Sequence, residues 1–211
     1  KADNQSKTYD GTALSATNTA SLTSGTLVSG HTATFTCTGS ITDKGSTTKT
    51  LSSVTIKSGS TDVTANYTII KNNGTLTVNA RPVTFTATNQ SKVYDGSALS
   101  VANTATATAG NGLVSGHTAT FTCSATAVTN VGSSTKSITG VTIKSGSTDV
   151  TANYNITKKT GTLSVTARPV TYKADNQSKT YDGSALSASN TATLTSGSLV
   201  SGHTATFTCT G

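Results

Sequence analysis

Residues 115–123 read Ser-Gly-His-Thr-Ala-Thr-Phe-Thr-Cys, and this stretch decides the fold class. One parity holds three threonines, and the other holds His117, Ala119, Phe121 and Cys123. A period of two places successive side chains on opposite faces of a strand, which is typical of an antiparallel strand with one buried face. Threonine suits the solvated face because its β-branched side chain fits the pleat. The stretch therefore predicts a half-buried β-strand.

The same stretch occurs three times, and its histidines His31, His117 and His203 lie 86 residues apart each time. The strings Tyr-Asp-Gly and Arg-Pro-Val-Thr recur with nearly the same period. A unit of this length can bury a small core of its own. We predict three repeats, at residues 1–80, 81–167 and 168–211. The first is expected to lack its opening strand, the second to be complete, and the third to hold only its N-terminal half.

The composition excludes several classes of protein. Serine and threonine make up 78 of the 211 residues, glutamate, methionine and tryptophan are absent, and only 11% of the residues are charged. Few good helix formers remain, which argues against a helical protein. No apolar run reaches the length of a membrane-spanning helix. A disordered serine- and threonine-rich stalk would show no phase against the apolar residues, so we favour strands over disorder.

The sequence between repeats indicates how they join. Leu76 and Val78 share one parity, whereas Val83 and Phe85, after the proline, take the other. Proline fixes φ and cannot donate to a ladder, so it fits a point where the buried face changes side. We expect the junctions to involve Arg81, Pro82, Arg168 and Pro169. Without a flexible linker, the repeats are predicted to form a stiff rod.

Turns punctuate each repeat every 8 to 12 residues or so, which indicates about seven short strands. The fold class predicted is all-β, with tandem Ig-like β-sandwich repeats of about 86 residues. A β-grasp arrangement is the alternative. Asp-Gly pairs predict tight turns, each preceded by a tyrosine that we expect to bury its ring at a corner. These turn and corner residues are Tyr9, Asp10, Gly11, Tyr94, Asp95, Gly96, Tyr181, Asp182 and Gly183.

The order of these motifs resembles the YDG/MBG-type tandem repeats of bacterial surface and secreted adhesin-like proteins. In the second repeat the motifs lie at Arg81–Val83, Ser91–Gly96, Leu113–Thr118, Asn153–Thr157 and Gly161–Val165. The resemblance covers essentially the whole chain. It implies an extracellular tandem-repeat scaffold with no enzymatic activity and no fixed ligand. The cysteine in each repeat is not a feature of that family.

Each repeat carries one cysteine, at Cys37, Cys123 and Cys209, on the same face as a phenylalanine. One cysteine per repeat has no partner within its repeat, so we expect a buried free thiol that packs as a small hydrophobe. The alternative is a disulfide between neighbouring chains, which an oxidising exterior would permit.

Other polar residues recur without forming a catalytic constellation. One histidine per repeat offers too few ligands for a metal site, so we expect each histidine to make a hydrogen bond at a strand edge. Lys7, Lys92 and Lys179 lie near the Asp-Gly turns, but an isopeptide bond needs a buried acid, so we expect surface lysines. We predict no enzyme, no cofactor and no metal.

Two functional hypotheses follow. The first is a structural stalk or fibre region of a bacterial extracellular surface protein, whose partners are neighbouring repeats and identical chains. The second is an adhesin module that binds a glycan or host ligand. The net charge of +7 is thinly spread. This argues against nucleic-acid binding and allows attraction to anionic cell-wall polymers or glycans.

Overall fold

The computed structural model describes residues 1–107 and 112–210, and these residues are nearly all β. Two short 3-10 turns, η1 (Thr64–Asn66) and η2 (Thr151–Asn153), are the helical segments of the described chain. The chain forms two compact units. Unit 1 comprises Lys1–Thr86, Ala105–Thr122 and Gly140–Lys159, and unit 2 comprises Ala87–Thr104, Cys123–Thr139 and Thr160–Gly211. These units cut across the sequence repeats, whose boundaries stay a prediction.

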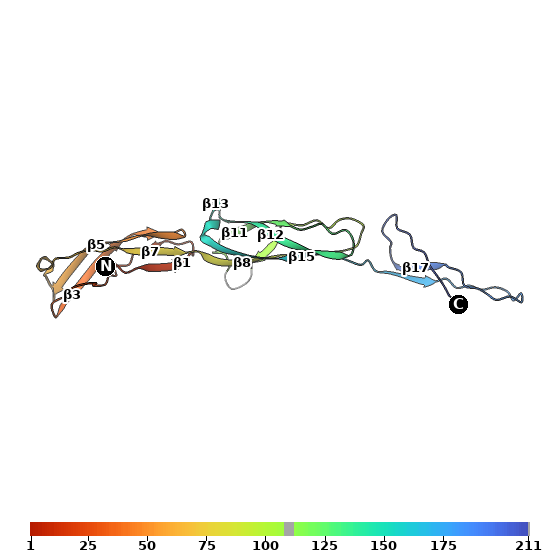
Figure 1. The fold of residues 1–211 in the computed structure, drawn as a ribbon, viewed down its shortest axis with the longest axis horizontal. Helices are drawn as coiled ribbons and strands as arrows, with labels where there is room; N and C mark the ends of the chain where they lie inside the picture. The colour runs from red at the N-terminus through yellow and green to blue at the C-terminus, as the bar shows by residue number, and fades with distance from the viewer. Residues whose placement is uncertain (108–111, 211) are drawn as a thin grey trace. The chain divides into compact units, whose positions relative to one another are not determined.

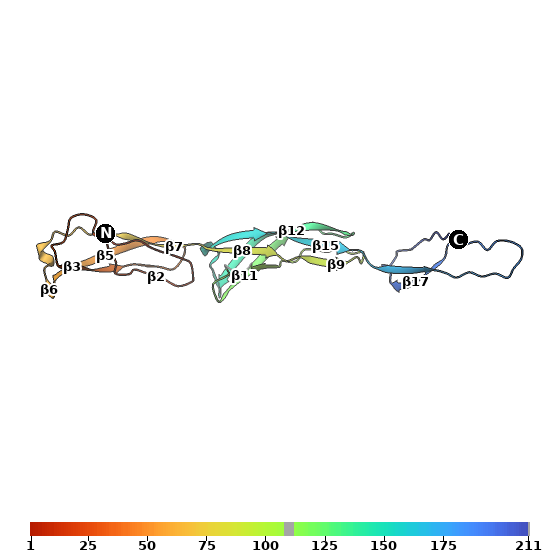
Figure 2. The same ribbon diagram turned by 90° about the horizontal axis from the view of Figure 1, so that it is seen from below.

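The first repeat contributes a mixed sheet to unit 1. Its order is β1 (Gln5–Thr8), β7 (Gly74–Asn79), β5 (Gly45–Ser58) and β3 (His31–Thr38). The long strand β5 pairs antiparallel with both β7 and β3, and β5 and β7 lie side by side in Figures 1 and 2. The edge strand β1 pairs parallel with β7. Short ladders join β6 (Thr61–Asp62) to β5, and β2 (Leu14–Ser15) to β4 (Ser40–Ile41).

A second sheet in unit 1 comes from the second repeat. Its order is β10 (Ala105–Ala107), β8 (Arg81–Ala87) and β14 (Tyr154–Lys159). The central strand β8 runs parallel to β14, with Val83 opposite Ile156. Every backbone position of β8 from Arg81 to Thr86 is paired with β14. The opening strand of a repeat is therefore the middle strand of this sheet.

Two further sheets contain the remaining strands of the described chain. One sheet has the order β11 (His117–Ser124), β12 (Gly132–Ser145), β15 (Gly161–Thr166) and β9 (Gln90–Val93), with β13 (Thr148–Asp149) paired to β12. Strands β11 and β12 contribute residues to both units. The other ladder joins β16 (Val170–Ala174) to β17 (Ala192–Gly197) in antiparallel register.

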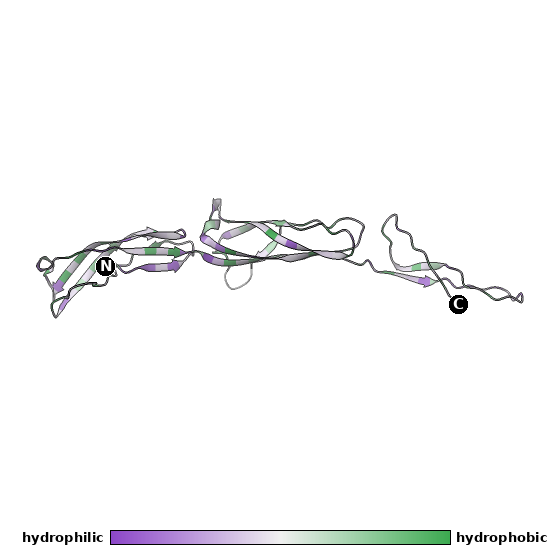
Figure 3. Cartoon of the chain, in the orientation of Figure 1, coloured by the Kyte–Doolittle hydropathy of each residue, from purple (hydrophilic) through white to green (hydrophobic). Residues whose placement is uncertain are grey.

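The core is formed by the apolar residues that alternate with polar ones along the strands. Figure 3 shows hydrophobic and hydrophilic residues alternating along them. In β8, Val83, Phe85 and Ala87 are at most 2% exposed while the residues between them are not buried. Burial of this apolar face is the main favourable term for folding. The predicted strand at residues 115–123 is confirmed as β11, which begins at His117.

The expected change of buried face between repeats is confirmed at the first junction. Only Ala80 separates β7 from β8, so one strand runs almost directly into the next. Leu76 and Val78 are buried before the proline, and Val83 and Phe85 are buried after it. At the second junction Leu163 and Val165 are buried, but Val170 remains 38% exposed. The Ig-like sandwich and the rod stay predictions.

Candidate functional site

A cluster of three rings joins the first repeat to the second inside unit 1. Tyr9, which directly follows β1, is only 3% exposed. Its ring lies against the imidazole of His117, with centroids 6.1 Å apart, and edge-on to the ring of Tyr154, at 5.7 Å. Such tilted and edge-to-face arrangements are the favourable geometries for aromatic pairs. The predicted burial of this tyrosine is thus achieved by residues of the following repeat.

Hydrogen bonds hold His117 and Tyr154, the two rings that the second repeat contributes to the cluster, in place. The Nδ1 atom of His117 lies 2.7 Å from the hydroxyl of Tyr154, and the amide of Val114 donates to the same hydroxyl at 3.1 Å. Burial raises the pKa of the Tyr154 hydroxyl. The first repeat repeats this pair, with His31 Nδ1 2.7 Å from the Tyr67 hydroxyl. Both histidines make the strand-edge hydrogen bond expected from the sequence.

The Tyr-Asp-Gly turn that carries Tyr9 is held by its own network. Asp10 accepts hydrogen bonds from the amide of Thr12 at 2.9 Å and from Lys7 Nζ at 2.7 Å. Gly11 has φ +80°, a conformation that favours glycine, and a Cβ there would lie 3.2 Å from a methyl of Val114. The same lysine–aspartate pair recurs at Lys92–Asp95 and Lys179–Asp182.

All three turns lower the pKa of their aspartate carboxyl group. The hydrogen bond from Lys7, followed by the bonds from Thr12, holds the pKa of Asp10 well below its ordinary value of 3.8. Lys92 and Ser97 lower the pKa of Asp95 in the same way, and Lys179 and Ser184 lower that of Asp182 to about 2. The side chains of the three aspartates are about half exposed, at 49%, 48% and 58%. Each turn is therefore held in place by a lysine–aspartate ion pair, directly after the tyrosine of the motif.

The ring contact recurs in unit 2 with equivalent residues. The ring of Tyr94 lies 5.8 Å from the imidazole of His203, and a Cβ on Gly96 would meet a methyl of Val200 at 3.0 Å. In contrast, Tyr181, which follows the same motif, is 92% exposed. The same turn therefore carries a buried tyrosine at Tyr9, a half-buried one at Tyr94 and an exposed one at Tyr181.

A buried asparagine adds a second contact between the first two repeats. Asn153 is 5% exposed; its amide nitrogen donates to Asp43 Oδ1 at 2.8 Å, and its oxygen accepts from the amide of Lys44 at 2.7 Å. The equivalent residue of the first repeat, Asn66, is exposed. Sequence reasoning missed this role, although the repeated string Asp-Val-Thr-Ala-Asn-Tyr around Asn153 was its signal.

Among the predicted junction residues, each arginine makes a hydrogen bond within its own repeat. Arg81 Nε donates to the carbonyl of Gly112 at 2.8 Å, and Arg168 Nε donates to the carbonyl of Ser198. Gly112 and Ser198 hold the same place in their repeats, each just before a Leu-Val-Ser-Gly-His string. Pro82 lies within β8, while Pro169 directly precedes β16. Each arginine thus ties the start of its repeat to the loop that precedes the histidine.

The cysteines differ in burial. Cys37 and Cys123 are free thiols, buried at 6% and 7% exposure, whereas Cys209 is free and partly exposed. The amide of each cysteine donates at 2.8 Å to the side-chain oxygen of an asparagine, namely Asn18, Asn103 and Asn190. The crosslink between chains stays a prediction.

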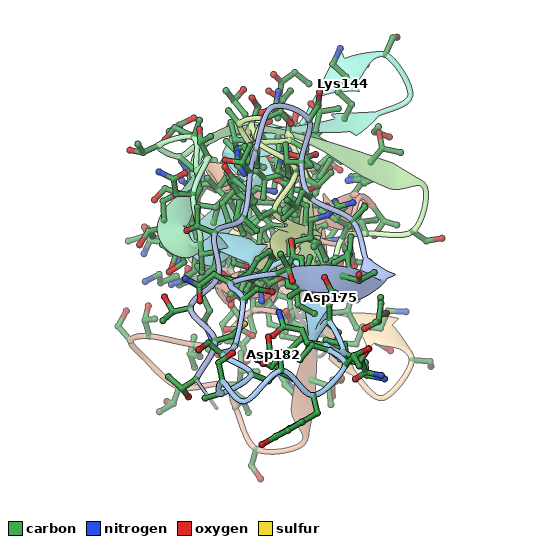
Figure 4. All side chains as sticks on the ribbon, turned by 90° about the vertical axis from the view of Figure 1, so that its right-hand side faces the viewer. Lys144, Asp175 and Asp182 are labelled. Carbon is green, nitrogen blue, oxygen red and sulfur yellow. The ribbon has the colours of Figure 1, made fainter. Side chains whose placement is uncertain are left out.

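Two lysines are fully buried, which the sequence did not indicate. Lys136 has no exposed surface, and its amine donates to Thr88 O, Gln90 Oε1 and Thr104 Oγ1 at 2.9–3.0 Å. Lys49, its counterpart in the first repeat, donates to Thr19 Oγ1 at 2.9 Å. By comparison, Lys144 is exposed and points outward from the hairpin of β12 and β13 in Figure 4. Buried lysines without an acid beside them are rare, so these amines depend on neutral oxygens.

Within residues 1–107 and 112–210, no group of three His, Cys, Asp or Glu side chains is placed to hold a metal ion. The part of the chain that the structure describes has no helix long and apolar enough to cross a membrane. No family model, curated protein or solved structure matches this chain. The arrangement that recurs in the described residues is a contact between repeats, made by a tyrosine turn on one side and a histidine on the other.

Proposed function

We propose that this chain is a structural, non-enzymatic repeat region of a bacterial extracellular surface protein or fibre. The observation that carries the proposal is the contact of Tyr9 with His117, repeated by Tyr94 with His203. Nearly identical residues make both contacts, so each repeat offers a turn to the next and a histidine to the previous one. A chain built this way extends by adding repeats, which is the behaviour of a stalk or scaffold.

Further contacts support a fixed interface between the first two repeats. We call this interface the Tyr9 joint, after the cluster of Tyr9, His117 and Tyr154. The side chain of Asn153 is buried against Asp43 and Lys44, and the strands β7 and β8 are separated by one residue. Both features restrict the freedom of one repeat relative to the next. A single residue between two strands is a short connection, and a buried amide left without its partners costs free energy. The proposal therefore includes Ig-like sandwiches held in a stiff rod by these joints.

The extracellular location rests on the sequence. The YDG/MBG resemblance implies a surface or secreted protein, and the serine- and threonine-rich strand faces are polar without being highly charged. A single free cysteine per repeat is compatible with either a buried thiol or a link between chains.

Small-angle scattering of the full chain tests the structural role. We expect a narrow distribution of angles between repeats, which Tyr9→Ala broadens because it removes the ring from the joint. Tyr181→Ala is the matched control, since Tyr181 is 92% exposed and is expected to leave the distribution unchanged. A broad distribution in the unmodified chain contradicts the proposal.

A glycan array separates this role from that of an adhesin module. Reproducible, saturable binding of the full chain to a defined glycan would favour the adhesin module. We expect no saturable binding. The array detects a ligand-binding chain and the scattering experiment detects a flexible chain, so the two experiments together distinguish these outcomes.

A further inference from the structure

In the first two repeats, the opening and closing segments run side by side in the same direction. In the second repeat, β8 pairs parallel with β14 and β9 pairs parallel with β15, and the latter pair can be followed in Figure 2. In the first repeat, β1 pairs parallel with β7. Both repeats therefore have their N-terminal and C-terminal segments joined by parallel ladders.

The two ladders of the second repeat share one register. Arg81 lies opposite Tyr154 and Gln90 lies opposite Leu163, so in both ladders a residue faces the one 73 places further along the chain. The first ladder has six paired positions and the second has four. The opening segment, β8 and β9, is therefore paired with the closing segment, β14 and β15, without a slip between the two ladders.

Further hydrogen bonds lengthen the β9–β15 ladder at both ends. Asn89 Oδ1 accepts from the amide of Thr162 at 2.9 Å on one side, and the amide of Tyr94 donates to the carbonyl of Thr166 at 2.9 Å on the other. The first repeat has the same two contacts, made by the amide of Thr75 to Asn4 Oδ1 at 3.0 Å and by the amide of Tyr9 to the carbonyl of Asn79 at 2.8 Å. The connection between opening and closing segments thus recurs in its details.

Glycine allows a close approach of the two segments. Gly161 begins β15 and is buried, and a Cβ there would overlap the carbonyl of Ala87, which ends β8. In the first repeat, a Cβ on Gly74, the buried first residue of β7, would overlap the carbonyl of Ala2. A larger side chain at either position would push the opening and closing segments apart, so the glycines keep the segments in contact.

The junction between the repeats connects these ladders directly. The strand β7, which closes the ladder of the first repeat, and the strand β8, which opens the first ladder of the second, are separated only by Ala80. Both strands are themselves fixed in parallel ladders. A pull on one repeat therefore reaches the next through a single residue, with no loose linker to extend first.

The direction of pairing decides how tension along the chain acts on the hydrogen bonds. Tension pulls the opening segment of the second repeat from Arg81 and its closing segment from Thr166. Because the strands of a parallel pair run the same way, these two points lie at opposite ends of the paired segments, and the strands are pulled past one another. All bonds of a ladder then share the load. In an antiparallel pair the two points would lie at the same end, and the bonds would break one after another.

We propose that the parallel ladders make each repeat that carries them a tension-bearing unit. This inference rests on the structural role proposed above and adds a mechanical function, in which the chain resists a pull that acts along it. The stiffness of the chain depends on the Tyr9 joint between repeats, whereas its resistance to stretching depends on ladders within a repeat. The two properties can therefore fail independently.

Pulling the second repeat in two directions tests the proposal. Full-length chains, with the three native cysteines replaced by alanine, carry tether cysteines at two exposed sites. Asn79→Cys with Ala167→Cys pulls along the chain, whereas Val93→Cys with Ala167→Cys pulls the β9–β15 ladder apart from one end. In single-molecule force spectroscopy we expect the first pair to unfold at a peak force at least about twice that of the second, because the bonds break together and not in turn. Equal peak forces, or no force peak in either direction, overturn the proposal.

Two asparagine variants, tethered at the chain termini with the native cysteines kept, provide a matched comparison. Asn89 and Asn103 are both exposed, and each accepts a hydrogen bond from a backbone amide, that of Thr162 at 2.9 Å and that of Cys123 at 2.8 Å. Of these two bonds, only the one to Asn89 joins the opening segment to the closing segment. Asn89→Ala and Asn103→Ala should therefore lose similar stability toward urea, while Asn89→Ala alone lowers the peak force of the second repeat. An equal lowering of the peak force by both variants would also contradict the proposal.

These force measurements are independent of the scattering experiment on the Tyr9 joint. A chain that is flexible in small-angle scattering but whose repeats resist tension contradicts the stiff rod proposed above and supports the tension-bearing ladders. A stiff chain whose second repeat unfolds at the same force in both directions contradicts the tension-bearing ladders alone.

Discussion

The ring of Tyr9 lies against the imidazole of His117, with centroids 6.1 Å apart and planes tilted by 43°. Tyr9 directly follows β1 of the first repeat and His117 begins β11 of the second, so the contact joins segments that are distant in the sequence. The turn network of Lys7 and Asp10 positions the tyrosine, and the Tyr154 hydroxyl positions the histidine. The joint is thus preorganised on both sides, which lowers the entropic cost of forming it.

Replacing Tyr9 by alanine is expected to destabilise unit 1. The change removes a side chain that is 3% exposed and leaves a cavity against His117 and Tyr154, at a cost of about 3 kcal/mol. Tyr181→Ala alters the same motif where the ring is 92% exposed, and it should change stability by less than about 0.5 kcal/mol. Urea unfolding of both variants checks this, and equal losses would show that the turn matters by itself and not through the joint.

The sequence predicted the strands better than it predicted their partners. The alternation ending in Phe121 and Cys123 identified β11, because a buried face leaves a local signal of period two. It does not encode direction, and β8 pairs parallel with β14, a relationship set by distant segments. The contact of Tyr9 with His117 was missed for the same reason, since nothing near Tyr9 in the sequence indicates which residue will cover it.

The buried lysines were missed for a different reason. Lysine is usually exposed, and Lys136 follows a Gly-Ser-Ser-Thr string that looks like a loop. Its burial depends on three oxygen acceptors that come from residues 88–104. Only the assembled fold brings these acceptors together.

Lys136→Met is expected to destabilise unit 2 by about 1–3 kcal/mol, because it keeps the side-chain length but removes the three hydrogen bonds that the buried amine donates. Lys144→Met is the matched control, since Lys144 lies on the same strand and points outward. Thermal or urea unfolding of the two variants measures the difference. A Lys136→Met variant as stable as the Lys144→Met variant would mean that water replaces the amine without cost.

Acid is expected to weaken the Tyr-Asp-Gly turns. The folded-state pKa of Asp10 and Asp95 lies below the ordinary value of 3.8, so the ionised carboxylates stabilise the fold above about pH 4. That contribution decreases as the pH falls below about 4, because the unfolded-state carboxylates take up protons there while the folded-state carboxylates stay ionised, and it is lost once the pH falls through the folded-state pKa. We expect the double variant Asp10→Asn, Asp95→Asn to lose less stability than the unmodified chain between pH 5 and pH 2, measured by urea unfolding. Identical pH dependence of the two proteins would exclude the turns as its source.

The three cysteines should differ sharply in reactivity. Cys37 and Cys123 are 6% and 7% exposed within completed strand ladders, so a thiol reagent reaches them only when the fold opens. Cys209 is partly exposed and follows β17 in a segment without strand partners. We therefore expect one fast-reacting thiol in the native chain and three in denaturant, with Cys209→Ser removing the fast phase.

By the same reasoning, a disulfide between chains forms through Cys209, so oxidised wild-type chain should give a dimer on non-reducing electrophoresis while oxidised Cys209→Ser stays monomeric. A dimer that survives in Cys209→Ser would show that Cys37 or Cys123 becomes exposed in the native state.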